Sequence, residues 1–159
     1  MKERKLMAHF IDASMNGTTA AYVRLGDDLE EYNIDLNPSV TQFKNILGES
    51  KVRNEGYEVS SSVSPYYYTD DDTLAEAVMA IANGRITGSG CETTVIDVLI
   101  DDDDSTMTTC AAYKENVKIV PQSMGGDTSG VQIPFQVYYN GSRTAGTFNM
   151  TTKAFTATT

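Results

Sequence analysis

The chain has 159 residues, of which 40% are apolar, and its 22 acidic against 12 basic residues give a formal net charge of −10. This length predicts a single domain, residues 1–159, and the apolar fraction is large enough for a core, which argues against global disorder. The acidity argues against a protein that binds nucleic acid tightly, because such binding requires Lys and Arg to neutralise phosphates. No apolar run approaches eighteen residues and no apolar signal region follows the charged N-terminus, so we expect no membrane span and a cytoplasmic start.

The first part of the chain predicts short strands joined by turns. Residues 7–12 (MAHFID) and 20–25 (AAYVRL) are apolar enough for two short strands. Residues 30–36 (EEYNIDL) alternate between apolar and polar side chains, which is typical of a strand with one buried face. Because residues 26–29 form a turn signal, we expect an early hairpin between the last two strands.

Residues 38–56 have weaker periodicity and two interpretations. The spacing of their apolar residues allows a short amphipathic turn of helix that ends at Gly48: Val40, Phe43, Ile46 and Leu47. Alternatively, the segment is a long extended loop whose apolar residues dock on something else. We favour the loop, because loops of this length are uncommon in compact domains and tend to be functional.

Residues 57–67 alternate again, and one face of the predicted strand carries only Glu and Ser. Such a face meets water, whether outside the protein or inside a channel. The one convincing helix follows at residues 70–83, where three Asp residues at the start offer N-cap oxygens. Its single apolar stripe fits a helix that covers one face of a sheet, and Gly84 is expected to end it in the left-handed conformation.

The rest of the chain predicts more strands. Residues 92–100 (ETTVIDVLI) are the best central strand, and residues 107–120 return along it. After a polar loop at 121–130, residues 131–140 alternate, with these side chains expected to point inward: Val131, Ile133, Phe135, Val137 and Tyr139. The Asn140-Gly141 pair predicts a hairpin turn toward residues 147–156. The sum is a mainly β protein with two packed antiparallel sheets and one flanking helix.

The chemical motifs do not support a catalytic or metal site. Asp101–Asp104 resembles a calcium loop, but Thr106 and Ala112 stand where that loop needs Gly and Glu. The glycines of 125–130 lack the Lys of a phosphate loop. The only histidine, His9, has no nucleophile motif near it, and a carboxylate pair for glycoside hydrolysis has no Trp platform beside it. Without a secretion signal we expect the two cysteines to be buried thiols. We therefore expect no enzyme, no cofactor and no metal.

Four segments of the chain resemble the tail tube protein (major tail protein) of long-tailed bacteriophages. They are residues 43–50 (FKNILGES), 57–74 (YEVSSSVSPYYYTDDDTL), 93–100 (TTVIDVLI) and 118–148 (KIVPQSMGGDTSGVQIPFQVYYNGSRTAGTF). Together they cover most of residues 7–156, in the expected order. The individual motifs carry no chemistry, so the resemblance rests on their order and on the total length.

The resemblance implies a sandwich or partial barrel with one flanking helix, and no additional decoration domain. Members of the family form hexameric rings whose inner strands join into one continuous β-barrel, and the rings stack into a tube that conducts DNA without binding it specifically. Tape-measure and tail-tip or terminator proteins would be partners, and the protein would be assembled in the host cytoplasm into the virion tail. Tubes of contractile tails, bacteriocins and type VI secretion share the fold.

The resemblance also suggests roles for particular residues. Residues 38–56 would reach a neighbouring subunit, with Phe43, Ile46 and Leu47 as apolar anchors. The polar faces of two segments would line the lumen, with these candidates: Glu58, Ser60, Ser62, Gln132, Gln136, Thr147, Asn149 and Thr151. Two alternatives stay open, a bacteriocin or secretion tube and a β-sandwich binding module that uses the aromatic cluster Tyr66–Tyr68.

Overall fold

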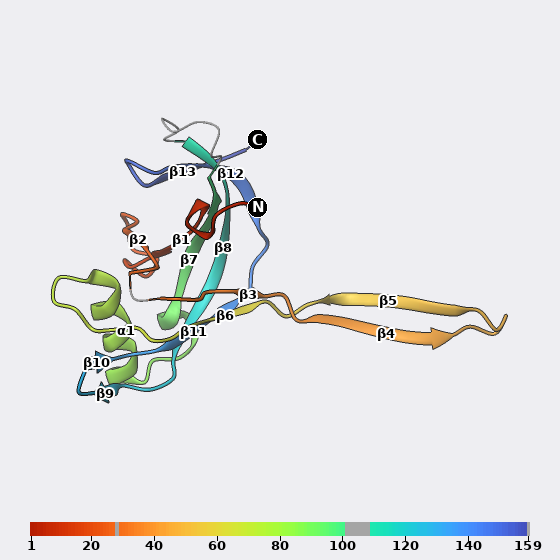
Figure 1. The fold of residues 1–159 in the computed structure, drawn as a ribbon, viewed down its shortest axis with the longest axis horizontal. Coiled ribbons are helices and arrows are strands. Elements are labelled where there is room, and N and C mark those ends of the chain that lie inside the picture. Colours follow the sequence, from red (N-terminus) through yellow and green to blue (C-terminus); the bar gives the residue numbers. More distant parts are fainter. Residues whose placement is uncertain (28, 101–108, 159) are drawn as a thin grey trace.

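A computed structural model describes residues 1–27, 29–100 and 109–158, and in these ranges the chain is mainly β, with antiparallel sheets and one α-helix (Figure 1). The strands are β1 Met7–Asp12, β2 Tyr22–Arg24, β3 Ile34–Asp35, β4 Pro38–Lys44, β5 Ser50–Tyr57, β6 Ser60–Val63, β7 Glu92–Leu99, β8 Thr109–Pro121, β9 Gly125–Asp127, β10 Gly130–Gln132, β11 Phe135–Tyr139, β12 Thr144–Asn149 and β13 Ala154–Ala157. The helices are α1 Thr73–Gly84 and two short 3₁₀ turns, η1 Arg4–Leu6 and η2 Gly88–Cys91.

Nine strands of the body form one antiparallel sheet. Seven of them follow the order β2-β1-β7-β8-β11-β6-β3, and the other two are β12, which pairs with β8, and β13, which pairs with β12. The long strand β8 organises it: one of its edges pairs with β7, and the other pairs first with β12 and then with β11. We expected two packed sheets. The main strands of the body instead join into one sheet, because the thirteen residues of β8 are enough to hold two partners end to end on one edge, and only β9–β10 and β4–β5 form separate two-stranded sheets among the described residues.

The core lies on both faces of this sheet. On one face, α1 packs against the strands as predicted, through Leu74, Val78 and Ile81. The fourth buried residue of its stripe is Ala75, whereas the spacing favours Ala77. On the other face a second cluster is centred on Phe10 and Phe148, whose rings lie 4.7 Å apart. Because side chains alternate along a strand, neighbours on β7 serve different clusters, Val95 the first and Ile96 the second. This double cover explains why β7 is buried almost throughout and confirms it as a central strand.

Helix α1 begins and ends slightly later than the predicted range 70–83. Asp72 is the N-cap, and its carboxylate accepts hydrogen bonds from the backbone N–H groups of Leu74 and Ala75 at 3.0 and 3.3 Å. At the other end Arg85, not Gly84, takes the left-handed conformation, with φ 47°. At Gly84 a Cβ would lie 3.1 Å from the Ile86 side chain, so a larger residue there would require Ile86 to shift.

The predicted early hairpin is wrong. Strand β2 pairs with β1, whereas β3 pairs with β6, so the two lie at opposite ends of the sheet order. The segment between them does not turn back tightly; it buries Tyr32, which packs in the cluster under α1. The alternating pattern of residues 30–36 therefore reflects the burial of one face of this segment, and it does not indicate pairing in a hairpin.

The predicted strand 131–140 is also interrupted, because Pro134 has no N–H to give to a ladder. Val131 lies on β10 and is exposed by 50%, whereas Phe135 and Val137 are fully buried on β11. The hairpin expected after Asn140 does not form: β12 pairs with β8, and its hairpin partner is β13. The acidic run at 101–104, weighed above as a calcium loop, lies outside the described residues.

The N-cap at Asp72 allows a test of how much the capping hydrogen bonds stabilise α1. Replacing Asp72 with Ala removes both cap hydrogen bonds and the acceptor of the Tyr66 hydroxyl, which lies 2.6 Å away. We expect a loss of about 1 kcal/mol in the free energy of unfolding, and a melting temperature lower by about 3 °C. Urea unfolding followed by circular dichroism measures it. Asp70→Ala is the control, and equal losses in the two variants would mean that general acidity, not the cap, stabilises the helix.

Candidate assembly surface

Strands β4 and β5 form an arm that projects away from the body of the protein (Figure 1). They pair with each other over seven positions and with no other described strand. The seven residues of β4 extend about 23 Å. Between residues 38 and 57 every side chain is exposed except for Asn45 and Gly56, which are half-buried. The backbone of residues 38–56 is thus extended, as favoured, but it forms two paired strands and not a loop; the helical interpretation is wrong.

The tip of the arm is an ordered three-residue loop that presents two aliphatic side chains. Asn45 and Glu49 close it: the Asn45 N–H donates to the Glu49 carbonyl at 3.0 Å, and the Asn45 side-chain oxygen accepts from the N–H groups of Leu47 and Glu49, both at 3.0 Å. Gly48 has φ 77°, the left-handed conformation that such loops need. This loop leaves Ile46 fully exposed and Leu47 exposed by 76%.

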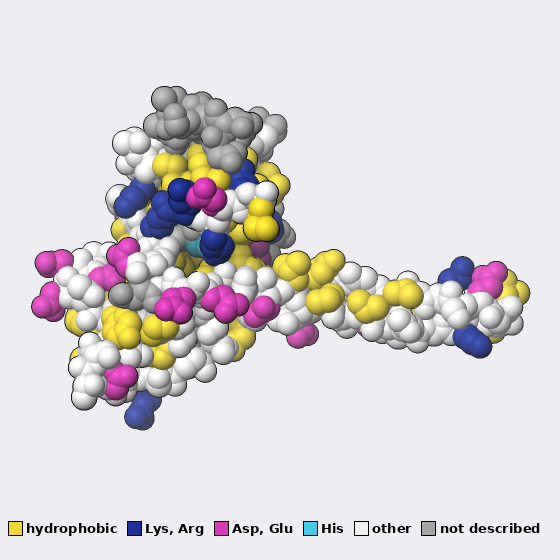
Figure 2. Space-filling model, in the orientation of Figure 1, with side chains coloured by type: hydrophobic (Ala, Val, Ile, Leu, Met, Phe, Trp, Pro, Cys, Tyr) yellow, Lys and Arg dark blue, Asp and Glu magenta, His cyan; other side chains and the backbone are white. Residues whose placement is uncertain are grey.

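The flanks of the arm carry further apolar side chains, visible as a row in Figure 2. Register places Val40, Val52 and Tyr57 on one face, and all three are at least half exposed. Phe43 lies on the opposite face, where the Arg53 guanidinium covers its ring at 4.9 Å. Of the three predicted anchors, the structure therefore brings Ile46 and Leu47 together at the tip and leaves Phe43 on a flank. Val52 and Tyr57 were not among the predicted anchors, because the bulge in β5 hides the alternation of its apolar residues.

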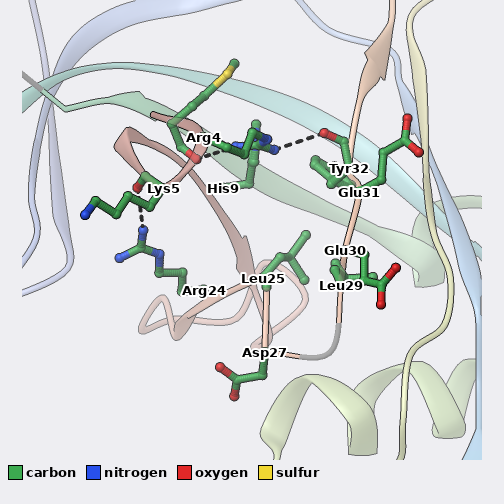
Figure 3. Close-up of a pocket in the computed structure, with 12 residues that line it drawn as sticks. Arg4, Lys5, His9, Arg24, Leu25, Asp27, Leu29, Glu30, Glu31 and Tyr32 are labelled. Atoms are coloured by element: carbon green, nitrogen blue, oxygen red, sulfur yellow. Dashed lines mark hydrogen bonds between the residues drawn. The ribbon is translucent and has the colours of Figure 1, made fainter. Parts of the chain in front are cut away.

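A cavity of about 500 Å³ opens on the body near the N-terminus (Figure 3). Its apolar lining includes Leu25, Leu29 and Tyr32, and its other lining residues include charged side chains of both signs. Basic residues line one side and acidic residues the other: Arg4, Lys5 and Arg24 against Asp27, Glu30 and Glu31. The sequence pattern does not indicate this cavity, because its lining comes from two segments, residues 4–9 and 24–32, that only the fold brings together.

Arg4 ties the N-terminal segment to the cavity. Its guanidinium donates to the Met7 carbonyl at 2.7 Å and to the Tyr32 carbonyl at 2.9 Å, and it lies 3.1 Å from Nε2 of His9. Because Arg can only donate, Nε2 must accept, and Nδ1 of His9 then donates to Asp97 at 2.8 Å. The only histidine of the chain is thus part of the wall, and it has a structural partner on each ring nitrogen.

Asp97 is the centre of a buried polar network behind that wall. Besides His9, it pairs with Arg143 at 3.2 Å, and Arg143 also approaches Glu115 at 3.4 Å. The guanidinium of Arg143 stacks on the Tyr113 ring at 4.5 Å. Burial raises the pKa of the Glu115 carboxyl, the charge of Asp97 adds to the rise and Arg143 offsets part of it. Buried charges of this kind are tolerated because each one has a partner.

The eight lumen candidates do not share one surface. Ser60, Ser62 and Gln136 lie on the sheet face opposite α1, where Gln136 is the direct cross-strand neighbour of Ser62. Thr147 and Asn149 lie on the other face, because they pair with the odd-numbered residues Ala111 and Thr109 of β8. The other three are elsewhere: Glu58 at the base of the arm, Gln132 on β10 and Thr151 in the β12–β13 turn. Only the first three form a continuous polar strip.

Comparison of the chain with protein-family models and with curated proteins gives no match. Among residues 1–27, 29–100 and 109–158, no three His, Cys, Asp or Glu side chains are placed to share a metal ion. In the same described ranges, no helix has the length and apolar character needed to cross a membrane.

Glu115 predicts a pH dependence of stability. Its raised pKa means that the folded chain holds this proton more tightly than the unfolded chain does, so the stability it contributes is present below its ordinary value of 4.5 and is lost as pH rises through the folded pKa. Glu115→Gln removes this titration. We expect the free energy of unfolding of the variant, relative to the native chain, to rise across that window. Urea unfolding between pH 4 and 7 measures it, with Glu92→Gln as the control. Parallel curves for Glu115→Gln and the native chain would contradict the prediction.

Proposed function

We propose that this chain is a structural tube protein of the phage tail tube type, which assembles into hexameric rings that stack into a conduit for DNA. The observation that carries the proposal is the β4–β5 arm. It exposes aliphatic side chains at its tip and along its flank, and it lies away from the body that could cover them. A two-stranded hairpin alone in water is marginally stable at best, so an arm of this kind is suited to pairing with a second molecule.

Self-assembly accounts for several other features. An arm on one side of a subunit and its receptor elsewhere make a heterologous contact, which gives a ring where the rotation closes and an open stack where it does not. Joining sheets into a closed barrel also pairs exposed strand edges, which would otherwise be an aggregation risk. In the tube, the polar strip of Ser60, Ser62 and Gln136 would face the lumen. The net charge of −10 would then hold DNA off the wall and let it slide.

The same reasoning supports the assignment of partners. A tube in the virion tail, assembled in the host cytoplasm, would be capped by tail-tip and terminator proteins, and a tape-measure protein would set its length. A tube of a bacteriocin or a secretion system has the same needs and is the nearest alternative.

A binding module is the second candidate function, and the 500 Å³ cavity is the observation in its favour, since small-molecule sites fall in the range of about 300–1,000 Å³.

The arm predicts the outcome of a direct assembly experiment. The purified chain is passed over a sizing column with light scattering and viewed by negative-stain electron microscopy, with a tail-tip complex added as a seed if it is monomeric. We expect rings or tubes with a central channel. Leu47→Asp should reduce the assembled fraction at least tenfold, because it places a charge in an apolar contact, while the monomer keeps its circular dichroism spectrum.

Met124→Asp is the matched control, because Met124 is also an exposed apolar residue but lies on the body, away from the arm. We expect it to assemble as the native chain does. Assembly that survives Leu47→Asp would remove the arm from the argument. A chain that stays monomeric at high concentration, with and without the seed, and binds a small ligand saturably would favour the binding module instead.

A further inference from the structure

The cavity near the N-terminus has a feature that a general small-molecule site does not need. Its basic wall carries Arg4, Lys5 and Arg24, and its acidic wall carries Asp27, Glu30 and Glu31, with Leu25, Leu29 and Tyr32 between them (Figure 3). In the space-filling view, basic and acidic groups lie on either side of this region (Figure 2). An occupant that fits must therefore be apolar at its centre and carry charges of both signs, separated from one another.

The tip of the arm has this composition. Ile46 and Leu47 form its apolar end, and both are more than three-quarters exposed. Behind them, Lys44 lies on one face of the arm, and Glu49 lies on the other face, where it pairs with Lys51 at 3.2 Å. The tip is held in one shape by Asn45, so it can enter a cavity with little further loss of conformational entropy.

We propose that the Ile46-Leu47 tip of one copy of the chain inserts into the N-terminal cavity of a second copy. The aliphatic side chains lie on Leu25, Leu29 and Tyr32. Glu49 faces the basic wall, and Lys44, which lies on the opposite face of the arm, faces the acidic wall. This inference rests on the proposed function, and it deepens it by naming the receptor of the arm.

The contact is intermolecular because of the geometry of the chain. The arm extends about 23 Å away from the body, and its strands pair only with each other in the described residues, so the tip does not fold back into its own cavity (Figure 1). Tip and cavity are different surfaces of the same chain, so each copy uses one to receive and the other to donate. Such a contact propagates from copy to copy until it closes.

A cysteine cross-link tests the contact. Ile46→Cys is combined with Glu30→Cys, which keeps Leu47 as the anchor and leaves Leu25 and Leu29 unchanged. Under mild oxidation we expect a ladder of multimers on a non-reducing gel, because each copy is linked both forward and backward. An equimolar mixture of the two single variants should give a dimer that contains one of each. Pairing Ile46→Cys with Ser123→Cys, an exposed position away from the cavity, controls for random collision.

A charge swap separates this proposal from the broader one. Arg24→Glu is expected to lower the assembled fraction about tenfold at low salt, and adding Glu49→Arg in the same chain should restore most of it, since the pair is complementary again. Lys153→Glu, which makes the same change of charge in the β12–β13 turn, should leave assembly unchanged.

The outcomes are distinguishable. Rings or tubes that form normally, with no ladder above the Ser123→Cys control and no rescue by Glu49→Arg, would overturn the cavity as the receptor and leave the tube proposal standing. A native chain that neither assembles nor cross-links, even with a tail-tip seed, would overturn both. A ladder together with rescue supports both.

Discussion

The constraint on which the structure depends is that the β4–β5 arm has no core of its own. A hairpin keeps its shape when its side chains pack on something, and here nearly every side chain from 38 to 57 faces solvent. The register of the arm and the Asn45 loop hold its form, but they bury little apolar area, and burial is the main source of stability in proteins. The arm is therefore the part of the molecule that gains most from a partner.

The base of the arm shows how this exposed element is fixed to the body. Strands β3 and β6 pair at the edge of the large sheet. The chain runs from β3 into β4 and returns from β5 into β6. Asn37, at φ 44°, turns the chain there, and its side-chain amide donates to the Glu58 carbonyl at 3.0 Å across the two strands. The direction of the arm is thus set by the sheet edge, and the sheet in turn is held by β8.

The sequence predicted the parts of this fold that local pattern controls. The strand of residues 7–12, the central strand near 92–99 and the helix with its Asp cap are where periodicity and capping residues placed them. Partner choice was predicted poorly, since β3 joins β6 and β12 joins β8, strands that lie far apart in the chain. The two packed sheets were expected for the same reason, because nothing in the pattern of β8 shows that it pairs with two strands on one edge.

The candidate site divides in the same way. Exposure of Ile46 and Leu47 was foreseeable, since an apolar segment without clear periodicity was already a poor fit for the core. The cavity was not foreseeable from the sequence. Arg4 contacts Tyr32 because β1 pairs with β7 in the sheet, and this pairing also places His9 against Asp97. One buried carboxylate thereby links the central strand to the N-terminal wall of the cavity. The N-terminal segment is short and has no buried residue in η1, so its position is set chiefly by these polar contacts. A receptor built this way is shaped by the body sheet, and its fit to the arm is a property of the whole fold.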